Sequence, residues 1–244
     1  MKVIEPIWNT KTETARRIRG RIEVILDWAK VRSYRFGENP ARWRGQMNQL
    51  LPARSKLNSV EHHAALPYSE ISDFMKALRA ISGNSAAAFE FLILAAARTS
   101  EVIYAKWAEI DFKKKLWIVP AARMKSRREH RVPLSSPAIA VLKQMEEGKG
   151  EYVFAGRSPY APLSNMALLM TLGRMNRADI TAHGFRSTFR DWAAECTNFP
   201  SEVVEMALAH VIEGKTEAAY RRGDLLDKRR QLMEAWAEYC AGDQ

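Results

Sequence analysis

Cysteine is scarce in this sequence, and the two that occur, Cys196 and Cys240, match no metal or redox spacing. Long apolar runs are missing as well, because no stretch approaches the roughly 20 residues that cross a bilayer. The chain does not open on a secretory signal. These absences argue against cysteine-based metal or redox chemistry and a membrane span, and they predict a soluble protein of a reducing compartment.

Acidic residues are in deficit, since 28 Asp and Glu stand against 38 Lys and Arg, giving a net charge of +10 and a pI near 9.7. This excess suits a polyanion such as nucleic acid, although many basic proteins bind none. Apolar residues make up 47% of the chain, so we expect a sizeable core. The 244 residues are enough for one ordinary domain with a small second one.

The first 52 residues are strongly basic and have helical periodicity. The stretch "ARRIRGRIEVILDWAKV" predicts a helix with one apolar side, formed by Ile18, Ile22, Ile25, Leu26 and Ala29. "RFGENPARW" breaks it, and Asn39-Pro40 should begin a shorter helix that reaches Leu51. Because so few residues make a thin core, residues 1–52 are interpreted as a partial helical region. Residues 53–65 are predicted to be a linker.

From Ser69 the pattern predicts a mainly α domain with a small antiparallel β-sheet, of the α+β class. "SEISDFMKALRAI" and "AAAFEFLILAAARTSEVIYAKWAEI" are predicted helices, and the second is nearly all apolar and therefore central. "KLWIVPAA" and "HRVPLS" alternate like strands around the charged turn "RMKSRRE", which predicts a β-hairpin. Further helices are expected over residues 136–147, 164–174, 181–196, 201–210 and 225–241.

The stretch "ITAHGFRSTFRDWAAE" gathers cationic and imidazole side chains at a helix start, where negative charge is ordinarily favoured. Three of them share one narrow sector of the helix: His183, Arg186 and Arg190. The neighbouring sector is predicted to be buried and contains Phe185, Phe189, Trp192 and Cys196. The cationic edge is therefore either solvated or a docking site for an anion.

Five further positions carry chemistry-bearing side chains: Arg98, Glu101, Lys125, His210 and Tyr220. Each has a plain explanation when taken singly. Arg98 could form a structural ion pair, for example with Glu101. A charged hairpin tip such as Lys125 is usually solvated, and a tyrosine is usually half-buried packing.

Together and in order, these residues resemble the tyrosine recombinases, the site-specific integrases of phages and genomic islands. "ARTSE" matches the family's R-x-x-E, "RMKSRREHRVPLS" its hairpin lysine, and "HGFR" its H-x-x-R. "LAH" and Tyr220 complete the set, which covers roughly residues 66–244. Many members carry glycine just before the first arginine, where this chain has "AAAR". The family's amino-terminal region usually comprises an arm-binding domain and a four-helix core-binding domain. Only about the last third of that region is present, so residues 1–52 would be a partial core-binding region, and the sequence is either a fragment or the product of a truncated gene.

The resemblance implies DNA strand cleavage and transfer with six catalytic residues: Arg98, Lys125, His183, Arg186, His210 and Tyr220. The arginines would bind the phosphate oxygens, with His210 adding a third hydrogen bond. Tyr220 would form a 3′-phosphotyrosyl bond, His183 would accept or relay its proton, and Lys125 would protonate the departing 5′-oxygen. Glu101 would support an arginine.

No cofactor is expected, neither metal nor ATP, because the covalent bond conserves the phosphodiester energy and no carboxylate cluster for Mg²⁺ is visible. The implied partners are double-stranded DNA attachment sites, a homotetramer assembled on them, and accessory DNA-bending proteins. The implied location is the bacterial cytoplasm, at the nucleoid, where a prophage or genomic island is integrated or excised.

Other basic residues are expected to contact the DNA backbone or to form a solvated face: Arg16, Arg17, Arg19, Arg21, Arg123 and Arg127. Arg190 has two interpretations, of which pairing with a nearby acid is favoured over DNA contact. The helix after Tyr220 could pack in cis or reach a neighbouring subunit. Two other functions stay open: a truncated, non-catalytic DNA-binding remnant and, less consistent with the "HGFR…LAH…AAYRR" wording, a type IB topoisomerase.

Overall fold

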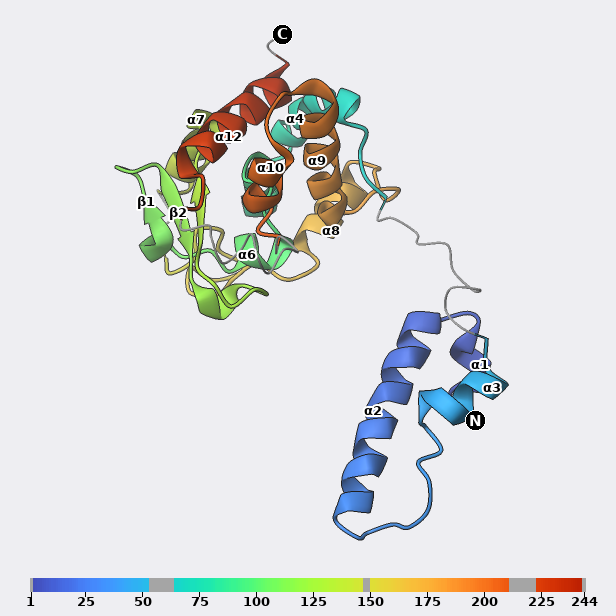
Figure 1. The fold of residues 1–244 in the computed structure, drawn as a ribbon. Coiled ribbons are helices and arrows are strands. Elements are labelled where there is room, and N and C mark those ends of the chain that lie inside the picture. Colours follow the sequence, from blue (N-terminus) through green and yellow to red (C-terminus); the bar gives the residue numbers. More distant parts are fainter. Residues whose placement is uncertain (1, 53–63, 147–149, 211–222, 243–244) are drawn as a thin grey trace. The chain divides into compact units, whose positions relative to one another are not determined.

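The structure is a computed structural model that describes residues 2–52, 64–146, 150–210 and 223–242 (Figure 1). The chain forms two compact units, Met1–His62 and His63–Gln244, called here the amino-terminal and carboxy-terminal units. The predicted linker, residues 53–65, lies outside the described residues except for Ala64 and Ala65.

The amino-terminal unit is helical, as the periodicity predicts. Its elements are α1 (Glu5–Trp8), α2 (Thr12–Val31), η1 (Trp43–Met47) and α3 (Asn48–Leu50). The prediction of a helix that begins at Asn39-Pro40 and reaches Leu51 is wrong, because Arg42 takes an extended conformation with ψ 129° and ends the first turn. The Asn39 side chain is buried, and its Oδ1 accepts from Ala41 N at 3.0 Å. Its amide donates to Glu23 O at 2.8 Å and to Asp27 Oδ1 at 2.7 Å, so the loop is fixed against α2.

The core of the amino-terminal unit is small. Trp8 stacks on Trp43 with ring centroids 5.4 Å apart, and Ile18 and Ile22 of α2 pack against the same cluster. The predicted apolar side of α2 is only partly buried, since Ile25 is 62% exposed. Among the described residues this unit has too few elements to cover α2 all round, which explains the exposure.

The carboxy-terminal unit is mainly helical with a small sheet, which confirms the predicted fold class (Figure 1). Its α-helices are α4 (Ile71–Arg79), α5 (Asn84–Leu94), α6 (Thr99–Ile103), α7 (Ser136–Met145), α8 (Ala167–Arg174), α9 (Phe185–Cys196), α10 (Ser201–Ala207) and α12 (Leu226–Ala241). Short 3-10 turns are η3 (Tyr68–Glu70), η4 (Trp107–Glu109), η5 (Ala121–Arg123) and η7 (Ala182–Gly184).

The sheet contains the predicted hairpin. Strands β1 (Ile110–Asp111), β2 (Leu116–Val119) and β3 (His130–Pro133) pair antiparallel in the order β1-β2-β3. In this register Trp117 faces Val132, and both side chains are buried, so one face of the hairpin belongs to the core. The segment that joins Val119 of β2 to His130 of β3 contains Lys125, whose side chain is exposed.

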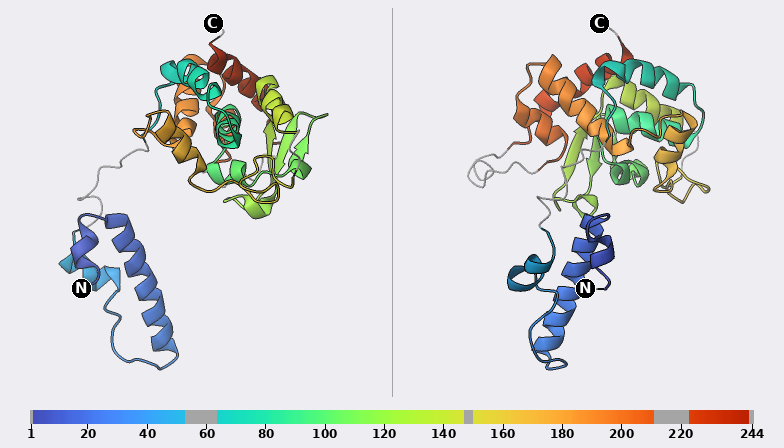
Figure 2. Two further views of the ribbon diagram at one scale, coloured as in Figure 1. Left: turned by 180° about the vertical axis from the view of Figure 1, so that it is seen from behind. Right: turned by 90° about the vertical axis from the view of Figure 1, so that its right-hand side faces the viewer.

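Helix α5 runs through the middle of the unit, as its nearly all-apolar sequence predicts (Figure 2). The expected single helix over 86–110 is wrong, because α5 ends at Leu94 and α6 begins at Thr99. On α9 the predicted stripe of Phe185, Phe189 and Trp192 is buried, but Cys196 at its end is exposed.

Helix α12 packs in cis within the carboxy-terminal unit. Trp236 donates its indole N–H to Ile93 O at 2.8 Å, near the end of α5. Its ring lies 4.9 Å from that of Trp192, centroid to centroid, so α12 also covers the buried stripe of α9. Across the described ranges, no helix combines the length and the apolar character needed to cross a membrane.

Gly184 lets the chain that enters the carboxy-terminal unit lie against the start of α9. A Cβ at this position would sit 2.3 Å from Ala64 O and 2.8 Å from Ala65 Cα. The same segment accepts hydrogen bonds from Thr181 N at 3.1 Å, through Ala64 O, and from Thr188 Oγ1 at 2.6 Å, through Leu66 O. The glycine in "HGFR" is therefore a packing requirement.

We predict that Gly184→Ala lowers the free energy of unfolding by about 1–3 kcal/mol, since the added methyl group forces a backbone shift. Urea unfolding monitored by circular dichroism measures this change. The matched control is Gly173→Ala in α8, where a Cβ meets nothing within 4 Å and helix propensity should stabilise by about 0.8–1 kcal/mol. Equal stability of Gly184→Ala and the unaltered protein would contradict the packing argument.

Candidate functional site

The site is built where the carboxyl end of α5 meets the carboxyl end of α10. Helix α5 ends in a Schellman motif, in which Ala97 N bonds to Leu92 O and Ala96 N bonds to Ile93 O, each at 3.1 Å. Ala96 takes the left-handed position with φ +47°, where glycine is usual. This turn stops the helix although alanine itself favours helix, and it points the Ala96 carbonyl away from α5's own hydrogen-bond ladder.

Helix α10 ends in the same way. Ala209 N bonds to Met206 O at 3.1 Å and His210 N bonds to Glu205 O at 3.0 Å. Ala209 is again a left-handed alanine, with φ +50°. Two helix ends of the same construction therefore present carbonyl groups, the negative pole of each helix, to the side chains around them.

Two of the predicted arginines bind these carbonyl groups. Arg186 donates from Nη1 to Ala96 O at 2.6 Å and from Nη2 to Leu208 O. Arg98 donates from Nη2 to Leu208 O and to Ala209 O, each at 3.4 Å. Because both guanidinium groups share the Leu208 carbonyl as an acceptor, they lie next to each other.

The predicted hydrogen bond between Arg98 and Glu101 is present. Arg98 Nη1 donates to Glu101 Oε1 at 2.7 Å, and the Arg98 backbone N–H donates to Oε2 at 2.9 Å. Glu101 is buried, and its carboxylate caps the start of α6 at the same time. Arg98 thus has its negative partner within the fold, whereas Arg186 relies on backbone carbonyls and His210.

Arg186 is the more deeply buried of the two arginines, at 5% exposed. Burial, followed by the charge of Arg98, lowers the pKa of the Arg186 guanidinium to about 10. It therefore remains protonated at neutral pH, and the pair concentrates two positive charges at one point. Such a pair is costly unless helix carbonyls and an incoming anion compensate it.

His210 joins Arg186 to a carboxylate. Its Nε2 lies 3.1 Å from Arg186 Nη2 and its Nδ1 lies 2.6 Å from Glu205 Oε2. Arg190 donates to the other oxygen, Glu205 Oε1, at 2.7 Å, which confirms the favoured interpretation of Arg190 as the partner of an acid. Burial raises the pKa of the Glu205 carboxyl, but hydrogen bonds from His210 and Arg190 outweigh it, and the pKa lies below its ordinary value.

Three of the six predicted catalytic residues are thus in one place: Arg98, Arg186 and His210. His183 is exposed on η7, the turn directly before α9. Lys125 is exposed in the turn between β2 and β3. Tyr220 lies outside the described residues, and the nearest described residues on either side of it are His210 and Gly223.

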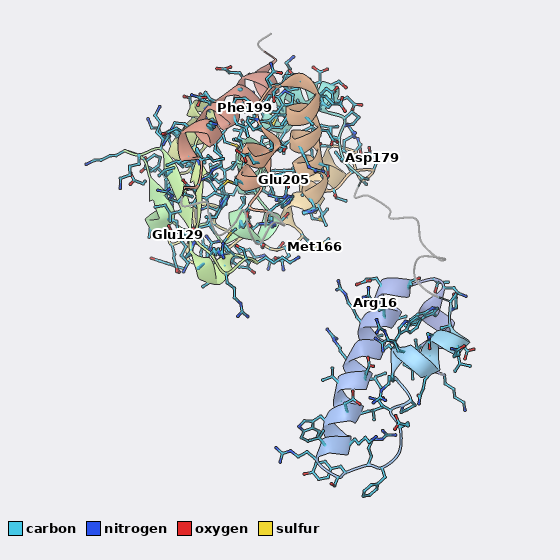
Figure 3. All side chains as sticks on the ribbon, viewed as in Figure 1. Arg16, Glu129, Met166, Asp179, Phe199 and Glu205 are labelled. Carbon is cyan, nitrogen blue, oxygen red and sulfur yellow. The ribbon has the colours of Figure 1, made fainter. Side chains whose placement is uncertain are left out.

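The basic residues predicted to contact DNA fall into two groups. Arg16, labelled in Figure 3, is exposed on α2, as are Arg17 and Arg21, and Arg127 is exposed in the hairpin turn. The other two are engaged internally. Arg19 bonds to Glu23 Oε2 at 2.6 Å and to Ala41 O at 2.7 Å.

Arg123 joins the residues after β2 to α6 and η4. Its Nη1 donates to the Glu101 carbonyl at 3.0 Å, and its Nη2 pairs with Glu109. The side chain is only 20% exposed. These contacts favour a structural role, in which the hairpin is tied to the helix start that holds Arg98.

Sequence reasoning missed a partly buried ionic cluster between β3 and α12. Asp224 Oδ2 accepts from Arg131 Nη2 at 2.7 Å and from Arg229 Nη2 at 2.8 Å. Arg229 also donates to Arg131 O at 2.6 Å and is 1% exposed. The cluster fixes the chain immediately after residue 222 to the sheet. The stretch "RRGDLLDKRR" contains Asp224 and Arg229, but the sequence does not reveal that they pair with each other and with Arg131.

His130, the first residue of β3, was also missed. Burial lowers its pKa to about 4, and the positive charges of Arg229 and Arg98 act in the same direction. It is therefore neutral at physiological pH beside a charged cluster. Among the described residues, no group of three or more His, Cys, Asp or Glu side chains is placed to hold a metal ion.

Comparison with known families gives two matches. Residues 65–225 match the phage integrase family, and residues 1–46 match the phage integrase central domain. Among curated proteins, prophage integrase IntA of Escherichia coli (strain K12) is 31% identical over 98% of this chain and 57% of its own length. Prophage integrase IntZ of the same organism is 35% identical over 94% of this chain and 56% of its own. The chain thus spans little more than half the length of these relatives.

Solved structures share the fold at low sequence identity. A lambda integrase (75–356) dimer bound to a COC′ core site superposes with a TM-score of 0.60 and 16% identity, covering 88% of this chain and 74% of that one. A lambda integrase tetramer bound to a Holliday junction gives a TM-score of 0.63 and 17% identity, with 86% of this chain and 62% of that one covered.

We predict that Ala96→Gly raises the free energy of unfolding by about 1 kcal/mol, because the left-handed conformation costs alanine about 1–2 kcal/mol, partly offset by the greater unfolded-state entropy of glycine. The control is Ala95→Gly, one residue earlier, where the backbone is right-handed and the change should destabilise by about 0.5–1 kcal/mol. Urea titrations of the two variants compare them directly. Destabilisation of similar size in both would show that Ala96 carries no strain.

We predict that the free energy of unfolding falls as the pH drops from 6.5 towards 4. Over this range His130 is protonated in the unfolded chain but stays neutral in the folded protein. The loss from this group should reach about 2 kcal/mol at pH 5. Unfolding free energies of the unaltered protein and His130→Gln at pH 7.5 and pH 5 measure it. The variant should lose less stability over this interval, and an identical pH dependence of the two proteins would contradict the assignment.

Proposed function

The chain belongs to the phage integrase family of tyrosine recombinases, and from this premise we propose that it cleaves and rejoins DNA strands at specific sites through a 3′-phosphotyrosyl intermediate. The observation that carries the proposal is the convergence of Arg98, Arg186 and His210 on the two helix ends described above. Two adjacent guanidinium groups with an imidazole beside them suit the non-bridging oxygens of one phosphodiester.

Phosphate binding is the first step of the proposed reaction. Guanidinium groups already fixed by carbonyls and by Glu101 need little reorganisation when the phosphate arrives, so their charge acts on the transition state. Burial and, after it, the charge of Arg98 lower the pKa of Arg186, and a bound phosphate would offset both effects. Compensation of the charges of Arg98 and Arg186 by the phosphate therefore contributes to the affinity for DNA.

Cleavage transfers the phosphoryl group from one oxygen to another. The phenolic oxygen of Tyr220 attacks phosphorus, and the bond to the 5′-oxygen breaks. The phenolic proton passes to His183, while Lys125 protonates the departing 5′-oxygen, so that a 5′-hydroxyl and a 3′-phosphotyrosyl bond remain. Attack by a 5′-hydroxyl of the partner strand reverses each transfer and reseals the DNA without ATP or a metal ion.

The proposed substrate is double-stranded DNA at attachment sites, and the proposed outcome is integration or excision of a prophage or genomic island. Residues 66–244 would be the catalytic domain, while residues 1–52 would contact the DNA backbone through exposed side chains such as Arg16 and Arg21. A homotetramer on two DNA sites and accessory DNA-bending proteins complete the proposal, which places the protein at the nucleoid of the bacterial cytoplasm.

We predict that the protein forms a covalent complex with an attachment-site duplex nicked next to the cleavage position, visible as a slower band on a denaturing gel. Tyr220→Phe should abolish this band, because the nucleophilic oxygen is gone, and should leave DNA binding in a mobility-shift assay unchanged. Tyr160→Phe, the same change at a 77% exposed loop residue, is the matched control and should cleave normally.

DNA binding by the unaltered protein without a covalent band would favour a non-catalytic DNA-binding protein. A covalent band of equal strength with Tyr220→Phe would overturn the assignment of the nucleophile.

A further inference from the structure

Glu205, labelled in Figure 3, is the one acid for which a direct contact with His210 is found among the described residues. We propose that Glu205 is a positioning residue for strand cleavage, which fixes the proton of His210 on Nδ1 and aims Nε2 at the phosphate between Arg98 and Arg186. This inference rests on the proposed function, and it assigns a role to a residue outside the six.

The two contacts of the imidazole define its tautomer. An ionised carboxylate only accepts hydrogen bonds, so the 2.6 Å contact with Glu205 Oε2 requires a proton on Nδ1. A guanidinium only donates, so the 3.1 Å contact with Arg186 Nη2 requires a lone pair on Nε2. In the Nε2–H tautomer, the lone pair of Nδ1 would face the Glu205 carboxylate, which also only accepts. The Nε2–H group would face the Arg186 guanidinium, which also only donates. Both contacts therefore point to the Nδ1–H form in the absence of DNA.

The fold holds Glu205 in place from two sides. The Schellman turn at Ala209 brings His210 back over the last turn of α10, where its backbone N–H bonds to Glu205 O at 3.0 Å. Arg190 of α9 occupies the second carboxylate oxygen at 2.7 Å. Helix α9 also carries Arg186, so the carboxylate, the imidazole and the guanidinium form one chain of contacts between two helices.

Phosphate oxygens accept hydrogen bonds and do not donate them. A hydrogen bond from His210 Nε2 to a phosphate oxygen therefore requires a proton on Nε2 in addition to the one on Nδ1, and a ring with both protons is an imidazolium. The charged side chains around it are Arg186 and Arg190 of α9, Arg98 before α6, Glu101 within α6, and Glu205 itself. Because the cations dominate this set, the negative charge of Glu205 is the local compensation for the imidazolium.

If this is correct, the rate of strand cleavage depends on the charge of Glu205 as well as on its shape. The substitution Glu205→Gln removes the charge with little change in volume. The rate of covalent-complex formation in a single turnover on the nicked duplex should fall on the order of 10²-fold, since the ring loses both its fixed tautomer and its countercharge. DNA affinity in a mobility-shift assay should stay within about twofold, because the arginines remain. Glu205→Asp, which keeps the charge, should recover part of the lost rate.

The matched control is Glu202→Gln, which removes the same charge from the same helix one turn earlier and should cleave at the unaltered rate. Circular dichroism establishes that each variant is folded. Cleavage by Glu205→Gln at the unaltered rate, or an equal loss in Glu202→Gln, would overturn the proposal.

A second readout needs no cleavage. Long-range ¹H–¹⁵N spectra of the DNA-free protein report the tautomer of each imidazole, and a His210→Gln variant identifies the His210 signals. The expected result is the Nδ1–H form in the unaltered protein and a loss of that preference in Glu205→Gln. An Nε2–H form in the unaltered protein would refute the proposal even if cleavage proceeds. Absence of cleavage in the unaltered protein would instead count against the proposed function, and the spectra would still decide the role of Glu205.

Discussion

The binding of two guanidinium groups by the ends of two helices is the interaction on which the rest of this site depends. Arg186 is almost fully buried, and a buried cation without compensation is strongly destabilising. The carbonyls of Ala96 and Leu208 supply that compensation from the negative poles of α5 and α10. The same contacts bring Arg98 beside Arg186, so the force that stabilises the fold also prepares the charge for an anion.

The local sequence predicts correctly those helices and strands whose hydrophobic periodicity matches the face that the fold buries. The hairpin of β2 and β3 and the buried stripe of α9 were predicted because alternation and helical periodicity each matched one face of the core. The end of α5 could not be predicted in this way, because a run of alanines favours helix. It is fixed by tertiary contacts such as that from Arg186, 90 residues along the chain. The helix expected from Asn39 fails at Arg42, whose extended backbone ends the turn that Asn39 begins, and no local residue preference reveals this.

The residues of the candidate site could be predicted where their order along the chain matches that of the tyrosine recombinases. Arg98, Arg186 and His210 are brought together in the structure, and the Arg98–Glu101 bond was expected from their spacing. Glu205 could not be found from order alone, because its role follows from the turn at the end of α10, which folds His210 back onto it. His130 was hidden by its place in an alternating strand, where nothing local reveals which charged groups lie opposite.

The cis packing of α12 has a consequence for assembly. Trp236 is completely buried against Trp192 and Phe189, and withdrawing one such aromatic residue into water costs about 4–6 kcal/mol by the area it hides. A domain-swapped arrangement, with this helix lodged in a neighbouring copy, would re-form the same contacts in every subunit, so this burial by itself favours neither arrangement. Any exchange of this helix between two copies must pass through a state in which that apolar area is exposed to water, so the buried area sets a kinetic barrier to exchange.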